Sequence, residues 1–402
     1  MGKRFDSVDA VRGALMVFML LDHTRDFTHA GAFFNDPLEP ASSTPILYLT
    51  RWIAHLCAPG FVFLAGMGAG LQLLRGIPVP ELARFLWTRG LWLVFLELCF
   101  FRVLIWWDVH PSLLAMLQVI WAIGVGMIVL SALVRLKARA VLAMGALIVA
   151  GHNLLDRLAV TPWRGPGTPV PSPLGKLWIV FHQGGVFPIA DFPSPILLPN
   201  YPVLPWFGLL ALGYGAAEVY AWPQERRRRL LLGLGAAMLL AFVALRYLNG
   251  YGDPRPWAPQ ADAVKTAMSF FNVQKYPPSL LFVLATLGWS ILALGLLEGR
   301  RLAGGLGRVM VTFGRVPLFF YCLQWPFAHL AGIVITASRG ESIAPYFMNV
   351  LRIVSLPEQP DMGGPLWMTH AAWTLGTVLL YFPCRWFAEV KARRRDWWLS
   401  YL

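Results

Sequence analysis

Residues 12–29, RGALMVFMLLDHTRDFTH, join an apolar run to a dense group of ionisable side chains. If the segment is helical, eleven steps of about 100° place Arg12 and His23 on the same face, roughly 16 Å apart along the axis. Met16 and Met19 lie between them on that face. The segment therefore predicts a helix with one cation near its start, an apolar stripe, and a histidine at the far end of that stripe.

The ionisable group at the end of this helix is the leading candidate for a functional site. Asp22, Asp26 and His29 stand at i, i+4 and i+7, and His23 and Arg25 flank them. Charged groups at membrane depth are costly, and where they occur they usually face a bundle interior or an aqueous cavity. The alternative is that the helix has left the membrane by residue 22 and the charges form a solvated cap. Only about ten apolar residues precede Asp22, too few to span a bilayer alone.

The composition indicates a polytopic membrane protein. The chain has 402 residues, of which 57% are hydrophobic and 14% charged, and its mean hydropathy is +0.57. The net charge of +13 sits in short clusters between apolar runs, which argues against a nucleic-acid partner. Lys3 and Arg4 precede a segment without a clear cleavage site, so we expect the first span to act as its own insertion signal. The four cysteines show no paired spacing, and we expect neither disulfides nor a metal site.

Apolar runs predict an all-α helical bundle, a single domain over residues 1–402, with about ten transmembrane helices. The expected spans are residues 9–29, 46–74, 84–106, 112–134, 138–158, 203–222, 229–248, 277–298, 308–336 and 366–388.

Basic residues follow every even-numbered span and set the expected topology. They are Arg75, Arg84 and Arg89; Arg135, Lys137 and Arg139; the run 226–229; Arg300, Arg301 and Arg308; and Lys391 with the run 393–395. The positive-inside rule then places both termini in the cytoplasm. The long connections 159–202 and 249–276 are expected outside, and the membrane is expected to be the inner membrane of a bacterium.

The two outer connections are rich in aromatic residues. Residues 174–189 are too short and too interrupted by glycine and proline to span, so we expect a re-entrant or interfacial segment. Rings can stack on pyranose faces while polar groups take the hydroxyls, although interfacial aromatic belts use the same residues. Trp206 and Tyr276, together with Arg25, are the candidate substrate-binding residues.

Five stretches resemble one known family. They are SVDAVRGALMVFMLLDHTRDF (7–27), APGFVFLAGMGAGLQL (58–73), YPVLPWFGLLALGYGAA (201–217), KYPPSLLFVLATLG (275–288) and FGRVPLFFYCLQWPFAHL (313–330). Together they resemble the heparan-alpha-glucosaminide N-acetyltransferase family and its bacterial relatives. Arg12 and His23, separated by ten residues, also match the arginine-x10-histidine pattern of the wider transmembrane acyltransferase superfamily.

The resemblance implies transfer of an acyl group, typically acetyl, from cytoplasmic acyl-CoA to a carbohydrate or amino-sugar acceptor on the outer side. It leaves two candidates for the active histidine. His23 fits the superfamily pattern, and His29 is the nearest match to the family's own histidine. Gln324 stands where the family's Phe-Tyr-x-Leu-His segment has a histidine, so a catalytic role there is doubtful.

The residues themselves suit this chemistry. An attacking hydroxyl or amine must lose a proton, and histidine, with an unperturbed pKa of about 6.5, can accept it at neutral pH. We expect His23 as the base, Asp26 or Asp22 as the carboxylate that orients it, and His29 in an assisting role. Direct attack and an acyl-histidine intermediate are both open. For acyl-CoA binding we expect cations on the inner side, namely Arg12, Arg84 and Arg89.

Two other classes of function compete with an acyltransferase. A transporter or flippase for a lipid-linked or small anionic solute would use the same charges to bind its solute. Transporters often show two matching halves, but the first and second five spans show no convincing repeat. In a non-catalytic scaffold or sensor, the charges would form a structural ion-pair network. Membrane lipid is the expected surrounding, and a homodimer is a possible assembly.

Overall fold

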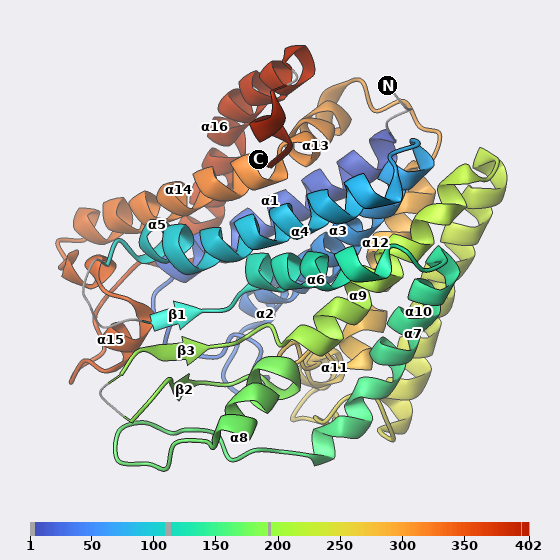
Figure 1. The fold of residues 1–402 in the computed structure, drawn as a ribbon. Coiled ribbons are helices and arrows are strands. Elements are labelled where there is room, and N and C mark those ends of the chain that lie inside the picture. The colour runs from blue at the N-terminus through green and yellow to red at the C-terminus, as the bar shows by residue number, and fades with distance from the viewer. Residues whose placement is uncertain (1–4, 109–113, 192–193, 395, 402) are drawn as a thin grey trace.

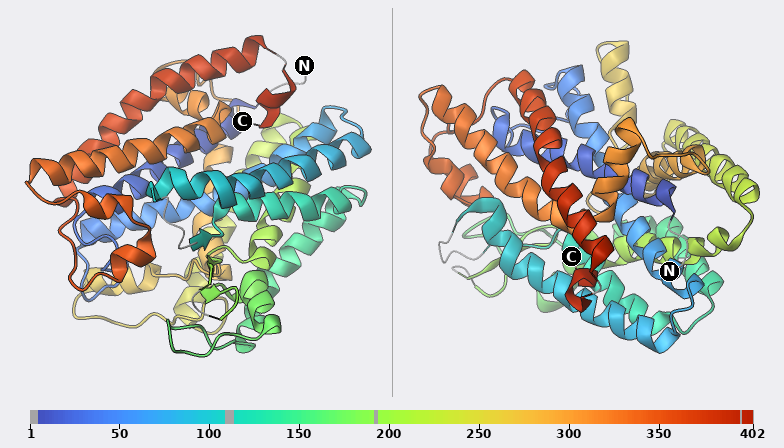
Figure 2. Two further views of the ribbon diagram at one scale, coloured as in Figure 1. Left: turned by 60° about the vertical axis from the view of Figure 1, so that its left-hand side comes forward. Right: turned by 90° about the horizontal axis from the view of Figure 1, so that it is seen from above.

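The computed structural model describes residues 5–108, 114–191, 194–394 and 396–401. They form a bundle of long helices, with a small sheet and several short helices gathered at one end (Figures 1 and 2). Phe5 and Ser400 line the same pocket, so both ends of the described chain lie at the other end of the bundle. The basic residues Lys3, Arg4 and Arg395, considered above from the sequence, lie outside the described residues.

The regular elements described in the first half of the chain are helices and one strand. Its elements are α1 (Asp6–Thr28), α2 (Pro45–Ile53), η1 (Ala54–Leu56), α3 (Cys57–Leu74), α4 (Val79–Phe95), η2 (Leu96–Phe101), α5 (Arg102–Trp106), β1 (Leu114–Met116), α6 (Val119–Leu133), α7 (Ala138–Gly151), η3 (His152–Arg157), α8 (Pro173–Trp178) and η4 (Ile179–Gln183). In this set η1 and η3 are 3-10 turns, whereas η2 and η4 are π-helical.

The second half adds the remaining strands and the C-terminal helices. Its elements are β2 (Phe187–Pro188), β3 (Ile196–Leu198), α9 (Val203–Ala216), η5 (Ala217–Ala221), α10 (Gln224–Leu248), α11 (Ala263–Phe271), α12 (Leu280–Leu297), α13 (Gly305–Arg315), α14 (Pro317–Ser338), η6 (Ala344–Phe347), α15 (Val350–Val354), α16 (Leu366–Arg393) and η7 (Trp397–Tyr401).

The helical membrane-protein class predicted from the sequence is confirmed in its main feature. Among the described residues, six helices are long and apolar enough to cross a membrane. They are Pro45–Leu74, Ala138–Arg157, Val203–Ala221, Gln224–Leu248, Leu280–Leu297 and Pro317–Ser338. Each of the other four predicted spans also contains helix. Of these, α1 has 23 residues, enough to span, but it carries several charged side chains.

Helix α1 lies inside the bundle and is buried on nearly every side. It contacts α3, α13, α14 and α16. Its apolar side chains, such as Leu15 and Leu20, are buried, and so are the polar Asp9 and Thr24. A helix that is buried all round can hold charged groups only if the neighbouring helices supply their partners.

The described part of the predicted span 112–134 begins with a strand rather than a helix. Residues 112 and 113 lie outside the described residues, and β1 pairs in parallel with β3 of the 159–202 connection. β3 also pairs with β2, in the antiparallel sense, so the sheet order is β1-β3-β2 (Figure 1). The helix itself starts at Val119, where the buried Glu97 carboxylate accepts a hydrogen bond from the Trp121 backbone N–H at 3.1 Å. This long-range cap fixes where α6 begins.

The predicted span 308–336 is two helices. They are divided at Val316, whose backbone is not helical (φ −132°, ψ 51°), directly before Pro317. Proline has no N–H to donate and disfavours helical geometry in the residue before it. Consequently α13 contacts the first half of α1, where Gly13 lies against Met310, and α14 contacts the second half, where Trp325 stacks on His23.

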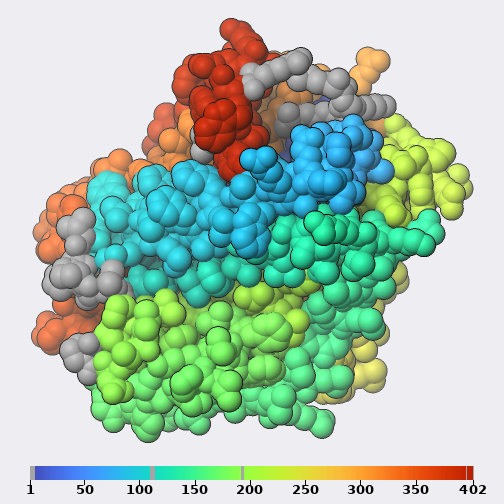
Figure 3. Space-filling view, viewed as in Figure 1, coloured from blue at the N-terminus to red at the C-terminus, as the bar shows by residue number. Residues whose placement is uncertain are grey.

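The 159–202 connection forms a compact cap over one end of the bundle (green in Figure 3). Its run 174–189 contains α8 and the π-helical η4, which ends at Gly184 with φ +72°. Six plus five residues are too few to cross a bilayer, and a re-entrant or interfacial position for this segment stays a prediction.

Two helix crossings depend on glycine. A Cβ atom on Gly66 of α3 would lie 1.9 Å from the Leu210 carbonyl oxygen of α9, and one on Gly213 of α9 would lie 1.9 Å from the Phe63 carbonyl oxygen of α3. On α1, a Cβ on Gly13 would lie 1.8 Å from the carbonyl oxygen of Met310 on α13. Without a strong hydrophobic drive between helices in lipid, such close backbone approach is a main source of association.

We expect Gly66→Ala to destabilise the protein by about 1–3 kcal/mol, because the added methyl group meets backbone that cannot move without separating α3 from α9. Gly68→Ala is the matched control. It lies two residues away on the same helix, and its Cβ would meet nothing within 4 Å. The midpoint of thermal unfolding in detergent should fall for Gly66→Ala and stay level or rise slightly for Gly68→Ala. Equal midpoints for the two variants would contradict the crossing geometry.

Candidate active site

Asp22, Arg25 and Asp26 near the end of α1 belong to a largely buried ion cluster. Arg25 is only 4% exposed, and its Nη2 donates to Asp26 Oδ1 at 2.6 Å and to Asp22 Oδ1 at 3.4 Å. From α2, Arg51 donates to the other oxygen of Asp22. Asp22 is 8% exposed. The alternative of a solvated cap is therefore wrong for Asp22 and Arg25.

Two cations of this cluster, Arg51 and Lys275, were not among the site residues predicted from the sequence. Arg51 is the only charged residue in the predicted span 46–74, and a lone cation in an apolar span is itself a functional signal. Lys275 comes from the loop between α11 and α12, is 9% exposed, and interacts electrostatically with Asp22. We call Asp22, Arg25, Asp26, Arg51 and Lys275 the ion cluster.

His23 lies beside the ion cluster under α14. Its ring stacks on the Trp325 ring, with centroids 3.8 Å apart and an interplanar angle of 20°, and the edge-on Tyr321 ring lies 6.2 Å away. Its Nδ1 is buried and makes no hydrogen bond among the described residues. Gln324 of α14 is fully buried, and its amide atoms likewise have no hydrogen-bond partner of normal geometry there. His23 therefore has a fixed ring plane and a buried nitrogen that makes no hydrogen bond of normal geometry among the described residues, although Gln324 lies close enough to interact with the ring.

His29 and Asp26 occupy different surroundings from His23. His29 follows the last turn of α1, its backbone N–H donates to the Arg25 carbonyl at 3.0 Å, and it pairs with Gly364. Asp26 has a side chain 32% exposed and is held by Arg25. Among the described residues Asp26 makes no hydrogen bond to His23. The acidic neighbour that acts electrostatically on His23 is Asp22.

A row of rings runs inward from Tyr276, whose ring lies 5.0 Å from the Lys275 Nζ of the ion cluster. The Tyr201 ring lies 5.4 Å from that of Tyr276 and 4.7 Å from that of Trp206. Burial alone would raise the pKa of the Tyr276 hydroxyl, but the charges of Lys275 and Arg51 hold that pKa below its ordinary value. Tyr276 is 38% exposed, whereas Trp206 is completely buried behind Tyr201. Of the two predicted substrate-binding rings, only Tyr276 is accessible.

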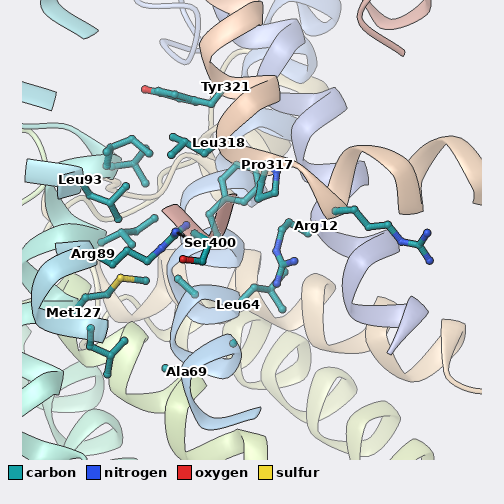
Figure 4. Close-up of a pocket in the computed structure, with 18 of the residues that line it drawn as sticks. Arg12, Leu64, Ala69, Arg89, Leu93, Met127, Pro317, Leu318, Tyr321 and Ser400 are labelled. Atoms are coloured by element: carbon teal, nitrogen blue, oxygen red, sulfur yellow. Dashed lines mark hydrogen bonds between the residues drawn. The ribbon is translucent and has the colours of Figure 1, made fainter. Parts of the chain in front are cut away.

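A pocket of about 310 Å³ follows α1 from its first half to the ring of Tyr321. Arg12, Met16 and Met19 all line it, which confirms that they share one helix face. Figure 4 shows Tyr321 at one end of the pocket, with Arg12 and Arg89 on opposite sides. The remaining wall is mostly apolar and includes Phe61, Leu64, Leu93, Ile120, Ile123 and Leu318.

A wider pocket of about 950 Å³ adjoins the first at the end of the bundle that holds both chain ends. Its lining carries more cations than carboxylates, namely Arg12, Arg75, Arg315 and Lys391 against Asp9 and Glu81. We call these four cations the basic mouth. Arg12 is itself held in place, since it donates to Asp9 Oδ1 at 3.2 Å and to the Gly314 carbonyl at 3.0 Å.

Of the three arginines predicted to bind acyl-CoA, the structure brings two to the pocket. Arg12 and Arg89 line it, and Arg89 also donates to the Ser400 carbonyl of η7. The Arg84 side chain is exposed and is not among the residues that line either pocket. The wider pocket is lined instead by Arg75, Arg315 and Lys391. Only the fold shows that these three cations lie at the pocket.

His23 therefore stands between the apolar pocket and the ion cluster. Met19, one turn before it, lines the pocket, and so does Tyr321, whose ring faces His23. On the other side Asp22 joins His23 to Arg51 and Lys275. A small molecule that entered by the basic mouth would reach the end of the pocket close to this histidine.

The fold and this centre define an integral membrane helical bundle with a buried charged site. The chain matches the family model of heparan-alpha-glucosaminide N-acetyltransferase, catalytic, over residues 4–246, more than half of its length, and it belongs to that family. No individual curated protein matches it. The family resemblance seen in the sequence is thus confirmed, and the membership identifies a transmembrane acetyltransferase rather than a transporter. The matched range includes α1 and Arg51, whereas α14 and Lys275 lie beyond it.

Proposed function

We propose that this protein transfers the acetyl group of acetyl-CoA, or another acyl-CoA, to the amine of an amino sugar on the opposite side of the membrane, with His23 as general base. The observation that carries this proposal is the pocket lined by Arg12, Met16 and Met19, which ends at Tyr321 against the ring of His23. Family membership supplies the class of reaction.

The two pockets suit the two parts of the donor. Phosphates of the CoA nucleotide bind best to arginine and lysine, which the basic mouth provides. The pantetheine arm and acyl group would then lie in the narrow pocket, whose walls are largely apolar. Both pockets have volumes in the range of small-molecule sites. By the positive-inside rule the basic mouth faces the cytoplasm, so CoA itself would not cross the membrane.

The transfer balances without a further reactant. The acceptor nitrogen attacks the thioester carbonyl while His23 takes the proton from the amine; the new C–N bond forms, the C–S bond breaks, and CoA leaves as a thiolate that regains the proton from the imidazolium. Asp22 would stabilise the positive imidazolium. Trp325, stacked on the ring, would hold its plane during the proton transfer. In this proposal Asp22, rather than Asp26, is the carboxylate that assists the base.

The acceptor would approach from the side of Tyr276. This ring is partly exposed, and the two residues next to it in space, Tyr201 and Lys275, connect it with the ion cluster. Rings and hydrogen-bonding groups together are suited to a sugar. On the proposed topology this side of the protein faces away from the cytoplasm. The membrane would be the inner membrane of a bacterium.

The proposal is tested by measuring free CoA release from acetyl-CoA by detergent-purified protein, with amino sugars and the matching neutral sugars as acceptors. We expect release that requires an acceptor with a free amine, together with acetylated product of matching amount. Equal release with the neutral sugars would change the acceptor to a hydroxyl. Release without any acceptor dependence would contradict the transferase proposal.

Arg89→Ala should raise the KM for acetyl-CoA roughly tenfold, equivalent to about 1.4 kcal/mol, because a charge-assisted contact at the pocket wall is lost. The KM for the acceptor should not change. Arg84→Ala is the matched control, since it removes an arginine five residues earlier on α4 that lines neither pocket. If both variants raise the KM for acetyl-CoA equally, the change comes from the loss of surface charge and not from the loss of a contact in this pocket.

A further inference from the structure

Two histidines and an aspartate meet at a point remote from the pocket of α1. His152 and Asp156 belong to η3, the turn that ends the α7 helix, and His182 belongs to η4, thirty residues further along the chain. One potential ligand atom of each residue lies within 4.8 Å of those of the other two. No other group of this kind occurs in the part of the chain that the structure describes.

His152 is the residue whose burial demands an explanation. It is 3% exposed, and neither ring nitrogen has a hydrogen-bond partner among the described residues. The ring lies near the backbone of Pro278, but no hydrogen bond of ordinary geometry joins them. Leaving a buried polar group unpaired costs about 1–3 kcal/mol. A metal ion bound to one of these nitrogens would offset that cost.

The surrounding groups already orient the other two ligands. Asn153 donates from Nδ2 to Asp156 Oδ2 at 2.8 Å, and Asp156 Oδ1 is 3.6 Å from His182 Nε2. The Trp178 ring stacks on His182 with centroids 5.0 Å apart. His182 Nε2 lies 3.0 Å from the His152 carbonyl oxygen, a contact that a metal would replace. Supporting hydrogen bonds of this kind are typical of metal ligands.

We propose that His152, Asp156 and His182 bind a Zn²⁺ ion that fastens the 159–202 connection to the end of α7. Two imidazoles and one carboxylate form a known zinc ligand set, whereas Mg²⁺ and Ca²⁺ prefer sites made only of oxygen. Bonds of about 2.0–2.2 Å bring ligand atoms closer together than 4.8 Å, so binding draws the three side chains inward. This site is contrary to the absence of metal expected from the sequence, because the cysteine pattern says nothing about histidines that meet only in the fold.

The fourth coordination position has an opening to solvent. Asp156 and His182 line a surface pocket of about 350 Å³, whose far wall includes Gln274 and Tyr276. A water molecule from this pocket can complete a tetrahedral site. The ion would therefore stiffen the wall that faces Tyr276 without touching the ion cluster. The site does not depend on the proposed acetyl transfer.

The test is direct zinc binding to the full chain, freed of its purification tag and treated with a chelator in detergent. Cys99→Ser is the background, because Cys99 is an exposed thiol that could bind zinc by itself. Titration with ZnCl₂ should give one ion per chain and raise the unfolding midpoint. His152→Ala and, as a milder change, Asp156→Asn should each weaken binding at least tenfold. His370→Ala, which removes a histidine elsewhere, should leave the affinity unchanged.

Cobalt substitution gives a second readout that does not depend on stability. Co²⁺ at this site should show the intense visible absorption of four-coordinate cobalt, and His182→Ala should abolish it. Zinc affinity that is the same in His152→Ala, Asp156→Asn and the parent protein would overturn the proposal. So would an absence of stoichiometric binding in the parent protein, and the three residues would then be an ordinary His–Asp contact.

Discussion

His23→Ala is expected to reduce acetyl transfer by roughly 10²- to 10⁴-fold, the range that a positioned general base contributes. The loss should fall on kcat, because no part of the proposed donor site uses this ring. His23 is placed for the role by two features: the pocket ends at Tyr321 beside it, and Trp325 fixes its ring plane at 20° to its own.

His29→Ala is the matched comparison, since it removes the competing histidine from the same helix. His29 lies beyond the last turn of α1 and pairs with Gly364, away from the residues that line the pocket. We expect its activity to stay within a few-fold of wild type. A His23→Gln variant separates loss of the base from loss of the fold. It should lose activity like His23→Ala while its unfolding midpoint stays equal to that of the wild type. If His29→Ala is the inactive variant, the assignment of the base moves to His29.

The organisation of α1 could be read from the sequence because it depends on helical periodicity alone. Eleven residues are close to three turns, which predicts that Arg12, Met16 and Met19 share a face with His23. The first three line one pocket, and the ring of Tyr321, which also lines it, lies 6.2 Å from the ring of His23. The family resemblance was also visible in the sequence, because it rests on short motifs that need no knowledge of the fold. What periodicity could not supply is which residues of other helices meet that face.

The ion cluster shows this limit most clearly. Arg51 and Lys275 are separated from Asp22 by long stretches of chain, and their approach is set by how α2 and the loop before α12 pack on α1. Charge balance in an apolar bundle predicts that Asp22 has a partner, but not which one. In contrast, Pro317 is a local signal for the division between α13 and α14, which was missed when one span was predicted over residues 308–336.

The cations predicted to bind acyl-CoA show the same limit of sequence-based prediction. The basic residues counted for the positive-inside rule include two of the basic mouth, Arg75 and Lys391, but the rule treats all cations at that end of the bundle alike. Arg84 and Arg89 lie five residues apart on α4, and the α-helix turns them in different directions, toward solvent and toward the pocket. Lys391 reaches the mouth only because α16 returns along the bundle.

Arg51→Met is expected to lower the free energy of unfolding by about 3–5 kcal/mol, because it leaves Asp22 buried without its closest cation. Arg25, 3.4 Å from Asp22 Oδ1, is already held by Asp26 at 2.6 Å and cannot replace Arg51 fully. Asp22→Asn in the same chain removes the uncompensated charge, so the double variant should recover part of the loss. The free energy is measured by unfolding in mixed micelles of increasing denaturing detergent.

The matched control is the pair of Arg139 and Glu218, whose side chains are 85% and 41% exposed. Breaking this pair by Arg139→Met should cost about 0.5 kcal/mol or less, because solvent screens both charges. If Arg51→Met costs no more than this control, Asp22 is hydrated in the folded protein and the cluster is open to water. If it costs several kcal/mol and Asp22→Asn restores none of it, Arg51 stabilises the bundle through contacts other than the ion pair. Only a loss that Asp22→Asn partly reverses fits a water-excluded cluster, and that exclusion is also what would allow Asp22 to stabilise a charged His23.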